Sequence, residues 1–176
     1  PVRCLMACLC VAVAALTGKV AQAGPPQFDP EYIIDRWETE DGLPGNSATC
    51  MVQDGQGYLW FGTFNGLVRF DGAAFRVFNS LNTPQLPSNG VVALHIDRTG
   101  RMWVGTLAGL AAFQHGKWVS YGDATAGLAA RTITERANGD LLITGFDTGL
   151  VEFSGERFRP LPAPPGDPAH GYLGAA

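Results

Sequence analysis

The sequence repeats itself at an interval of 43 residues, and this repeat limits the folds open to the chain more than any other feature. Residues 54–67 read DGQGYLWFGTFNGL, and residues 97–110 read DRTGRMWVGTLAGL. The Leu-Pro pairs at 43–44 and 86–87 keep the same interval. The shared positions are Asp54, Gly57, Trp60, Gly62, Thr63 and Gly66 in the first copy, and Asp97, Gly100, Trp103, Gly105, Thr106 and Gly109 in the second.

A third and weaker copy follows after about 40–42 further residues. In this copy Gly145 and Gly149 stand for the glycines that flank the central turn, while the Trp, the Asp and the Thr after the first glycine are lost. The Asn138-Gly139 pair replaces the Asp-x-x-Gly turn. We therefore expect the same hairpin with a different turn chemistry.

Each copy is expected to form four short strands. Val91–Ile96 is rich in branched aliphatic residues, and the Asp-x-x-Gly after it has the residues of a type I turn. The next strand, Leu59–Phe61 or Met102–Val104, is apolar on both faces, as in a sheet that lies between two others. Asn65-Gly66 is typical of a two-residue turn with a positive φ at both positions.

A repeating unit of about 40–45 residues with four strands has the size of a β-propeller blade. The predicted fold class is all-β, with about three four-stranded blades of roughly 40–43 residues. Closed propellers have about four to eight blades, so three make an incomplete propeller. The composition agrees: 23 glycines suit many turns, and a charged content of only 16% suits sheets that are covered on both faces.

The N-terminal residues are typical of an export signal. Cys4–Leu16 is an unbroken apolar run, too short for the roughly 20 residues of a membrane span, and an Ala-Gln-Ala pattern follows at 21–23. We expect a signal peptide at 1–23 and an exported, periplasmic protein. Because the chain opens with Pro and only Arg3 precedes the apolar run, we expect the front of the signal to be missing and the sequence to be a gene fragment.

The remaining chain is divided on the repeat into a segment at 24–36 that would supply a ring-closing strand, blades at 37–78, 79–121 and 122–161, and a loop at 162–176 towards a missing fourth blade. Cleavage would leave Cys50 as the single cysteine, which excludes an intrachain disulfide and favours a small core side chain. The net charge of −4 offers no basic surface for nucleic acid.

The first copy resembles the two-component regulator propeller repeat. The resemblance rests on Trp37, on the Gly-Leu-Pro at 42–44, on the 54–67 motif and on Asp71-Gly72, and it extends more weakly through the third copy. In that family such repeats build propellers outside the cytoplasmic membrane, and the chain continues through a transmembrane helix to a histidine kinase, hybrid kinase or diguanylate cyclase. The resemblance implies an output domain, and a membrane span, outside this sequence.

The repeated residues are expected to be structural. Asp54 and Asp97 have the residue type of a catalytic carboxylate or a Ca²⁺ ligand, but the same placement in both copies favours turn capping. Trp60 and Trp103 are expected to pack between sheets rather than stack on a sugar. The histidines have no metal-ligand spacing, and we expect no catalytic residue, metal site or cofactor; they are His95, His115 and His170.

Ligand specificity is expected in the irregular connections between blades, at 40–46, 79–89 and 121–131. Asn46, Asn89 and Arg131 are expected at equivalent positions at the ends of these connections, and they are the candidate ligand-binding residues. The alternative is that the Leu-Pro pairs and the asparagines only fix a tight path into the innermost strand. The ligand would be a small molecule or a glycan.

The leading hypothesis is a non-enzymatic, ligand-sensing propeller of a bacterial signal-transduction receptor, which self-associates as part of a larger protein. One alternative is a stand-alone periplasmic propeller that binds a protein or glycan. The other is a propeller glycosidase, because Asp-x-x-Gly-x-x-Trp resembles the Asp-box turn of sialidases. Those enzymes need an arginine cluster and a Tyr/Glu pair, and the sequence shows no such set.

The repeat count leads to a prediction about the chain in isolation. Three blades leave the outer faces of the first and last blade uncovered, so Gly24–Ala176 should pair with itself or aggregate. Size-exclusion chromatography with light scattering measures this directly. A monodisperse monomer with a sharp cooperative melt would contradict the prediction.

Overall fold

The computed structural model describes residues 35–146 and 149–162. The chain divides into two units, Pro1–Arg36 and Trp37–Ala176. Of the first unit only residues 35–36 are described, and they form no strand. The expected signal peptide, most of the expected ring-closing segment, His170 and most of the loop after 162 lie outside the described residues. All elements below belong to the second unit.

Twelve strands form three four-stranded antiparallel sheets, each with its strands in sequence order. The first sheet contains β1 (Cys50–Gln53), β2 (Leu59–Thr63), β3 (Gly66–Phe70) and β4 (Phe75–Phe78). The second contains β5 (Val91–Ile96), β6 (Met102–Thr106), β7 (Gly109–Gln114) and β8 (Lys117–Ser120). The third contains β9 (Ala130–Glu135), β10 (Leu141–Gly145), β11 (Leu150–Ser154) and β12 (Arg157–Leu161). Short 3-10 turns lie at Thr39–Asp41 (η1) and Asp123–Thr125 (η2).

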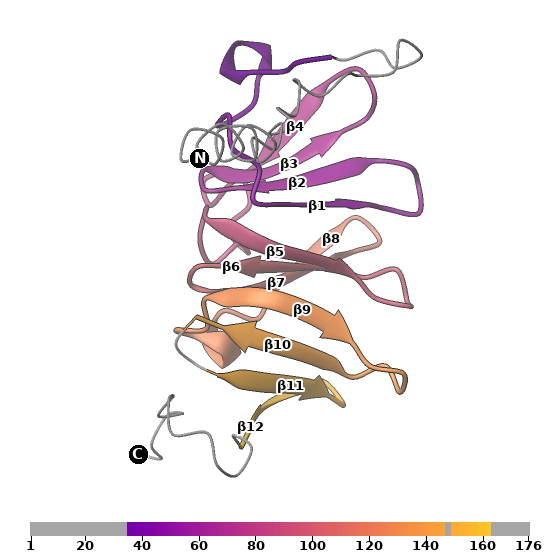
Figure 1. The fold of residues 1–176 in the computed structure, drawn as a ribbon, viewed down its shortest axis with the longest axis vertical. Coiled ribbons are helices and arrows are strands. Elements are labelled where there is room, and N and C mark those ends of the chain that lie inside the picture. The colour runs from indigo at the N-terminus through magenta and orange to yellow at the C-terminus, as the bar shows by residue number, and fades with distance from the viewer. Residues whose placement is uncertain (1–34, 147–148, 163–176) are drawn as a thin grey trace, which may run out of the picture. The chain divides into compact units, whose positions relative to one another are not determined.

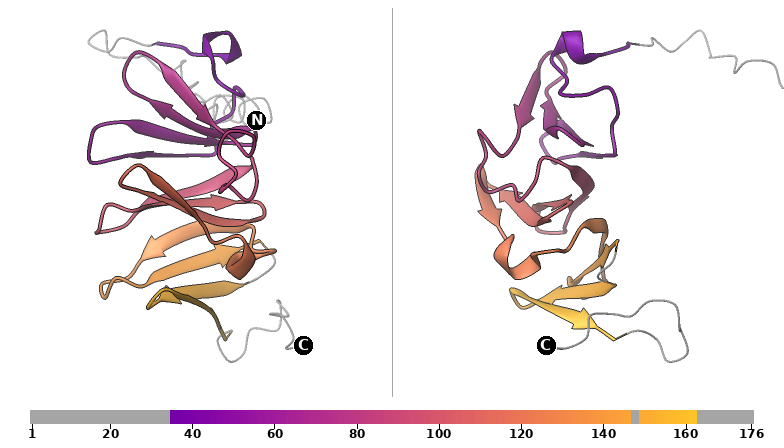
Figure 2. Two further views of the ribbon diagram at one scale, coloured as in Figure 1. Left: turned by 180° about the vertical axis from the view of Figure 1, so that it is seen from behind. Right: turned by 90° about the vertical axis from the view of Figure 1, so that its left-hand side faces the viewer.

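The three sheets lie face to face, with β1, β5 and β9 following one another along one edge (Figure 1). The view from behind and the view from the side show the same stacking (Figure 2). The described strands close no ring. The expected fold class, an all-β incomplete propeller, is confirmed.

The hydrophobic core lies between the sheets rather than within them. One cluster joins Trp60 of the first sheet to Val91 and Val104 of the second, and another joins Trp103 of the second to Ile143 of the third. All five residues of β6 are buried, whereas β2 and β10 alternate with half-buried positions. Among the described sheets the second alone has a neighbour on both faces, which accounts for its complete burial.

Two glycines allow the sheets to approach one another. A Cβ atom on Gly62 would lie 2.9 Å from Val91 Cγ1, and one on Gly105 would lie 2.9 Å from the Cβ of Ala130. Both neighbours belong to the innermost strand of the following sheet. The repeated glycine therefore sets the distance between successive sheets, since real Cβ atoms do not approach so closely.

The expected turn at Asn65-Gly66 is wrong. Thr63 pairs with Gly66, so the two loop residues are Phe64 and Asn65, and Asn65 does not have a positive φ. The Thr63 hydroxyl donates to the Gly66 carbonyl and accepts from the Asn65 N–H, at 2.8 and 3.1 Å. This side-chain closure replaces the need for two positive φ angles. Turns with two positive φ angles occur instead at 115–116 and 155–156.

The alignment of the third copy is also corrected. The backbone bond that closes the first hairpin starts from Asp97 in the second sheet and from Arg136, 39 positions later, in the third. Gly145 therefore takes the place of Thr106 and not of Gly105, so the alignment expected from the sequence is wrong by one position.

The first two sheets share a hydrogen bond between the turn carboxylate and the tryptophan. Asp54 Oδ2 accepts from the indole Nε1 of Trp60 at 2.8 Å, and Asp97 Oδ2 accepts from Trp103 Nε1 at 2.8 Å. The other oxygen accepts two backbone N–H groups of the same turn in each case. Each carboxylate thus closes its turn and satisfies an indole that is only 1% exposed.

The third sheet replaces this pair with an arginine and a glutamate. Arg136 and Leu142 stand where the other sheets have Asp and Trp. Glu152, 2% exposed on the adjacent strand, accepts from Arg136 Nη1 at 2.9 Å and from Arg159 Nε at 2.6 Å. In this sheet the turn residue is the donor and the residue of the adjacent strand is the acceptor, and the buried carboxylate of Glu152 is again fully paired.

Replacing Asp97 with Asn should lower the free energy of unfolding by about 1–3 kcal/mol, because the amide nitrogen cannot accept the bonds that the carboxylate accepts. Burial alone would raise the pKa of Asp97, but hydrogen bonds from Thr99, Trp103 and backbone N–H groups outweigh it and lower the pKa below 3.8. This contribution is complete above the ordinary pKa and is lost as the pH falls through the lowered one.

Urea unfolding followed by tryptophan fluorescence at several acidic pH values measures both effects. Asp97→Asn should flatten the loss of stability at low pH, while the exposed Asp123→Asn should leave it unchanged. Equal pH profiles for Asp97→Asn and the unaltered chain would show that this carboxylate does not stabilise the fold.

Candidate functional site

The antiparallel order sorts the loops to two ends of the sheets. The turns β2–β3, β6–β7 and β10–β11 and the connections into β1, β5 and β9 lie at one end, called here the connection end, on the left in Figure 1. The β1–β2 and β3–β4 turns and their equivalents lie at the other, the hairpin end. The predicted ligand residues belong to the connection end, and the carboxylate turns belong to the hairpin end.

Asn46 and Asn89 lie at the connection end, but they differ in what they contact. Asn89 Oδ1 accepts the N–H of Ser80 at 2.8 Å, which fixes the long 79–89 connection. Asn46 is exposed, and nearby Asn65 donates from Nδ2 to the Pro44 carbonyl at 2.8 Å. The side chain of Asn89 is thus engaged within the fold, whereas Asn46 faces solvent.

Arg131 is not equivalent to Asn89, which corrects the sequence-based alignment. It lies inside β9, at a point where the pairing with β10 shifts by one residue. The same irregularity occurs in the second sheet at Val92, so these two are the equivalent residues. A bulge turns its extra residue away from the ladder, and Arg131 is exposed with its guanidinium carbon 5.6 Å from the ring centre of Phe146.

Sequence reasoning missed the exposed apolar side chains in the turns at the connection end. Phe64, Leu107 and Phe146 are 58%, 44% and 51% exposed. They are the first residues of the turns β2–β3, β6–β7 and β10–β11. We call them the turn trio. The signal was present in the sequence, since an apolar residue follows the last residue of the second strand in all three copies.

Backbone hydrogen bonds hold two members of the turn trio, Leu107 and Phe146, in place. Leu107 N–H donates to the Gly90 carbonyl at 2.9 Å, and Phe146 N–H donates to that of Ala129 at 3.1 Å. Each turn is thereby tied to the connection of its own sheet. The apolar side chains are presented to solvent by a rigid backbone, an arrangement suited to stacking on a ring or an apolar partner.

The polar groups beside the turn trio suit binding rather than catalysis. Asn46 offers an amide and Arg131 a guanidinium, and neither is a general base at neutral pH. Among residues 35–146 and 149–162 no group of three His, Cys, Asp or Glu side chains is placed to hold a metal ion. In the same part of the chain no helix has the length and apolar character of a membrane span.

A Tyr/Glu/Arg cluster, which the sequence did not reveal, joins the second and third sheets: Arg101 and Glu156 lie at the hairpin end, and the phenol of Tyr121 reaches them from the start of the connection into β9. Arg101 Nη1 donates to Tyr121 Oη and to Glu156 Oε1, at 3.4 and 3.3 Å, and Tyr121 donates to Glu156 Oε2 at 3.4 Å. Burial, followed by the charge of Glu156, raises the pKa of Tyr121. A phenol that holds its proton more firmly is a poor nucleophile, so the cluster serves as a link between the sheets.

Two other reactive residue types are placed in the interior. His95 Nε2 is buried without a hydrogen bond and lies 3.9 Å from Glu135 Oε2, between the second and third sheets. Cys50 is half-buried in β1, where burial raises the pKa of its thiol. A thiol with a raised pKa carries little thiolate, so Cys50 has a packing role.

The family comparison agrees with these repeated positions. The model of the two component regulator propeller matches residues 42–65 and 85–108. The resemblance found in the sequence is confirmed for these two segments, each of which matches the repeat of this family. A comparison with curated proteins finds no significant match.

Solved structures establish the fold. The extracellular domain of BT4673 from B. thetaiotaomicron, assigned as a hybrid two component system, matches with a TM-score of 0.60 at 21% identity, over 73% of this chain and 18% of that one. The extracellular domain of BT3049, assigned likewise, matches with a TM-score of 0.56 at 22% identity, over 68% of this chain and 17% of that one. Virginiamycin B lyase from Staphylococcus aureus matches with a TM-score of 0.56 at 16% identity, over 70% of this chain and 44% of that one. The chain therefore spans less than half the length of each of these three structures.

Serine in place of all three members of the turn trio should change the free energy of unfolding by no more than about 0.5 kcal/mol per site, because the side chains are largely exposed. Urea titrations of the triple variant and of the buried Leu67→Ala variant measure the contrast. Leu67→Ala should cost about 2–5 kcal/mol. A comparable loss in the triple variant would show that the trio is a part of the core.

Proposed function

We propose that the two-component regulator propeller repeats of this chain form the ligand-binding part of an exported bacterial receptor, with the signalling output encoded outside the sequence. The observation that carries the proposal is the connection end. There, equivalent turns of three sheets hold exposed apolar side chains, with the Arg131 guanidinium over the ring of Phe146 and the exposed amide of Asn46 at the same end. The names of the BT4673 and BT3049 domains, both extracellular and assigned to hybrid two component systems, support the same reading.

The proposed ligand is a ring-bearing small molecule or a glycan fragment. Phe64 and Phe146 offer faces for stacking, and Arg131 and Asn46 offer hydrogen bonds to hydroxyl groups. Sugars have apolar ring faces and polar edges, which suit this combination. The chain itself performs no chemistry in this proposal, and no cofactor takes part.

Signalling requires that the ligand favour one arrangement of the receptor. A ligand that binds two arrangements equally shifts no population, however tightly it binds. In the proposal the receptor self-associates, and the ligand at the connection end changes how two copies are placed relative to one another. The bound state then biases a histidine kinase or diguanylate cyclase across the membrane.

Two alternatives stay open to experiment. A stand-alone periplasmic protein would use the same connection end to hold a protein or a glycan without an output domain. A propeller glycosidase would need a nucleophile and an acid at the binding face. In the Tyr121 cluster, Arg101 and Glu156 lie at the opposite end, and the raised pKa of the Tyr121 phenol makes it a poor nucleophile.

Reading the gene downstream of Ala176 tests the receptor. The reading frame should continue through a transmembrane segment into a kinase or cyclase domain, and a stop codon directly after Ala176 would contradict the proposal.

A glycan array probed with the chain tests the binding face. Spots that bind the chain should weaken at least tenfold with the triple serine variant of the turn trio and with Arg131→Gln. They should keep their intensity with Arg157→Gln, an exposed change on β12. Hydrolysis of a bound glycan would favour the glycosidase instead.

A further inference from the structure

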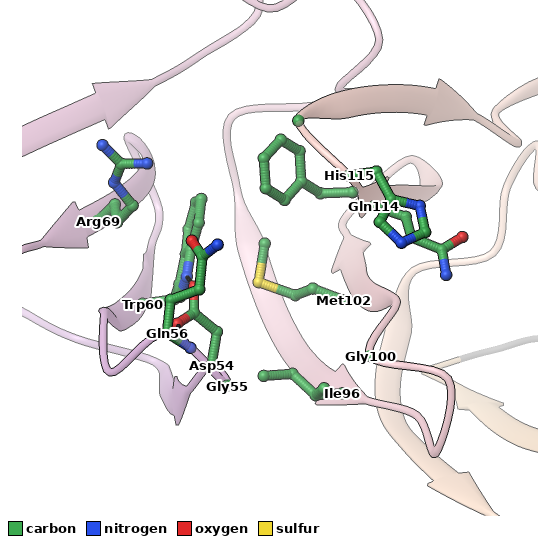
Figure 3. A pocket seen from close by; sticks show the side chains of 12 residues that line it. Asp54, Gly55, Gln56, Trp60, Arg69, Ile96, Gly100, Met102, Gln114 and His115 are labelled. Atoms are coloured by element: carbon green, nitrogen blue, oxygen red, sulfur yellow. Dashed lines mark hydrogen bonds between the residues drawn. The ribbon is translucent and has the colours of Figure 1, made fainter.

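A groove runs between the first and second sheets from the hairpin end along their outer strands to Asn82, Thr83 and Gln85 of the 79–89 connection. It consists of two adjoining cavities of about 410 and 360 Å³, which share Arg69, Phe113 and Gly116 as walls. None of the proposed ligand residues of the connection end lines either cavity. In Figure 3 Arg69 and Trp60 stand on one side, Ile96 and Met102 on the other, and His115 lies beyond them.

Arg69 lacks a carboxylate partner among the described residues. Its guanidinium carbon lies 4.4 Å from the ring centre of Tyr58 and 5.8 Å from that of Trp60, and it forms neither an ion pair nor a hydrogen bond with the described part of the chain. Its charge makes a small contribution to lowering the pKa of Asp71, after the bonds from the Ala74 and Ala73 N–H groups. Stacking fixes the guanidinium and leaves its N–H donors open to the groove.

The neighbouring interface shows what is missing here. Between the second and third sheets, Glu156 reaches across from the β11–β12 turn to Arg101, at 3.3 Å. The equivalent residue of the β7–β8 turn is Gly116, because both residues directly precede the last strand of their sheet. Arg101 itself corresponds to Tyr58, 43 positions earlier, and the guanidinium carbon of Arg69 lies 4.4 Å from the centre of that ring. The turn that would carry a glutamate beside this arginine therefore has a residue without a side chain, and a groove lies in its place.

From this comparison we infer that the groove between the first two sheets binds a small organic acid, whose carboxylate pairs with Arg69 in the space left by Gly116. Arginine binds carboxylates through two parallel N–H bonds, which suits the open edge of this guanidinium. The apolar body of the acid lies against Met102, Phe113 and Trp60. The combined volume is in the range of drug-sized ligand sites.

Asp54 also lines the first cavity. Both of its oxygens accept hydrogen bonds from Trp60 and from the turn, so the carboxylate is held in its own turn and forms no ion pair with Arg69. Donors are available on the far wall, where Gln114 and His115 line the same cavity. The groove is thus apolar in its floor, cationic at one wall and supplied with polar side chains at the other.

Phenylacetate and its neutral amide, phenylacetamide, form a matched pair of probes. The chain, captured at low density on a biosensor through a C-terminal tag, should bind phenylacetate saturably. It should bind phenylacetamide at least tenfold more weakly. Arg69→Ala, which introduces the alanine that the second sheet has at this position, should weaken the binding of phenylacetate at least tenfold. Arg157→Gln is the control and should not change either affinity.

Gly116→Glu provides a test that does not remove the arginine. Gly116 has a φ of 76°, and Glu156 adopts 62° at the equivalent position, so the turn accommodates a glutamate. A Cβ there meets no atom within 4 Å. The new carboxylate should pair with Arg69 and so weaken the binding of phenylacetate at least tenfold. It should not weaken glycan binding at the connection end. Equal affinity for the two probes, no saturable binding, or unchanged binding in both variants would overturn the inference.

Discussion

The hydrogen bond from a buried indole to the carboxylate of its own turn is the interaction on which the rest of the structure depends. Trp60 and Trp103 fill the space between successive sheets, and each needs a partner for its N–H in a place that water does not reach. Asp54 and Asp97 supply it while they close the first hairpin of their sheets. Local turn geometry and the packing of neighbouring sheets are thereby set by the same side chain.

The same dependence explains where the chain is free to vary. Gly62 and Gly105 must admit the next innermost strand, so the interior of each interface accepts little change. The two ends of the sheets carry no such restriction. The turn trio at the connection end, and the contrast between Gly116 and Glu156 at the hairpin end, show differences between copies where a ligand would be distinguished.

The repeat alone was enough to predict the three sheets and the burial of Trp60 and Trp103, because a fixed interval requires equivalent environments. The details of the third sheet were beyond it. The bulge at Arg131 depends on strand pairing, which the sequence does not display, and the pairing of Arg136 with Glu152 joins the β9–β10 turn to β11. The predicted turn at Asn65-Gly66 was wrong because the hydroxyl of Thr63 closes the hairpin instead.

Hydrogen exchange at the four indole N–H groups, followed by NMR, tests the central interaction most directly. The indole protons of Trp60 and Trp103 should exchange slowly and together with the most protected backbone amides. Those of Trp37 and Trp118, whose indole nitrogens have no hydrogen bond to the described residues, should exchange within the dead time. Rapid exchange at Trp60 and Trp103 would show that the carboxylate turns do not hold the sheets together.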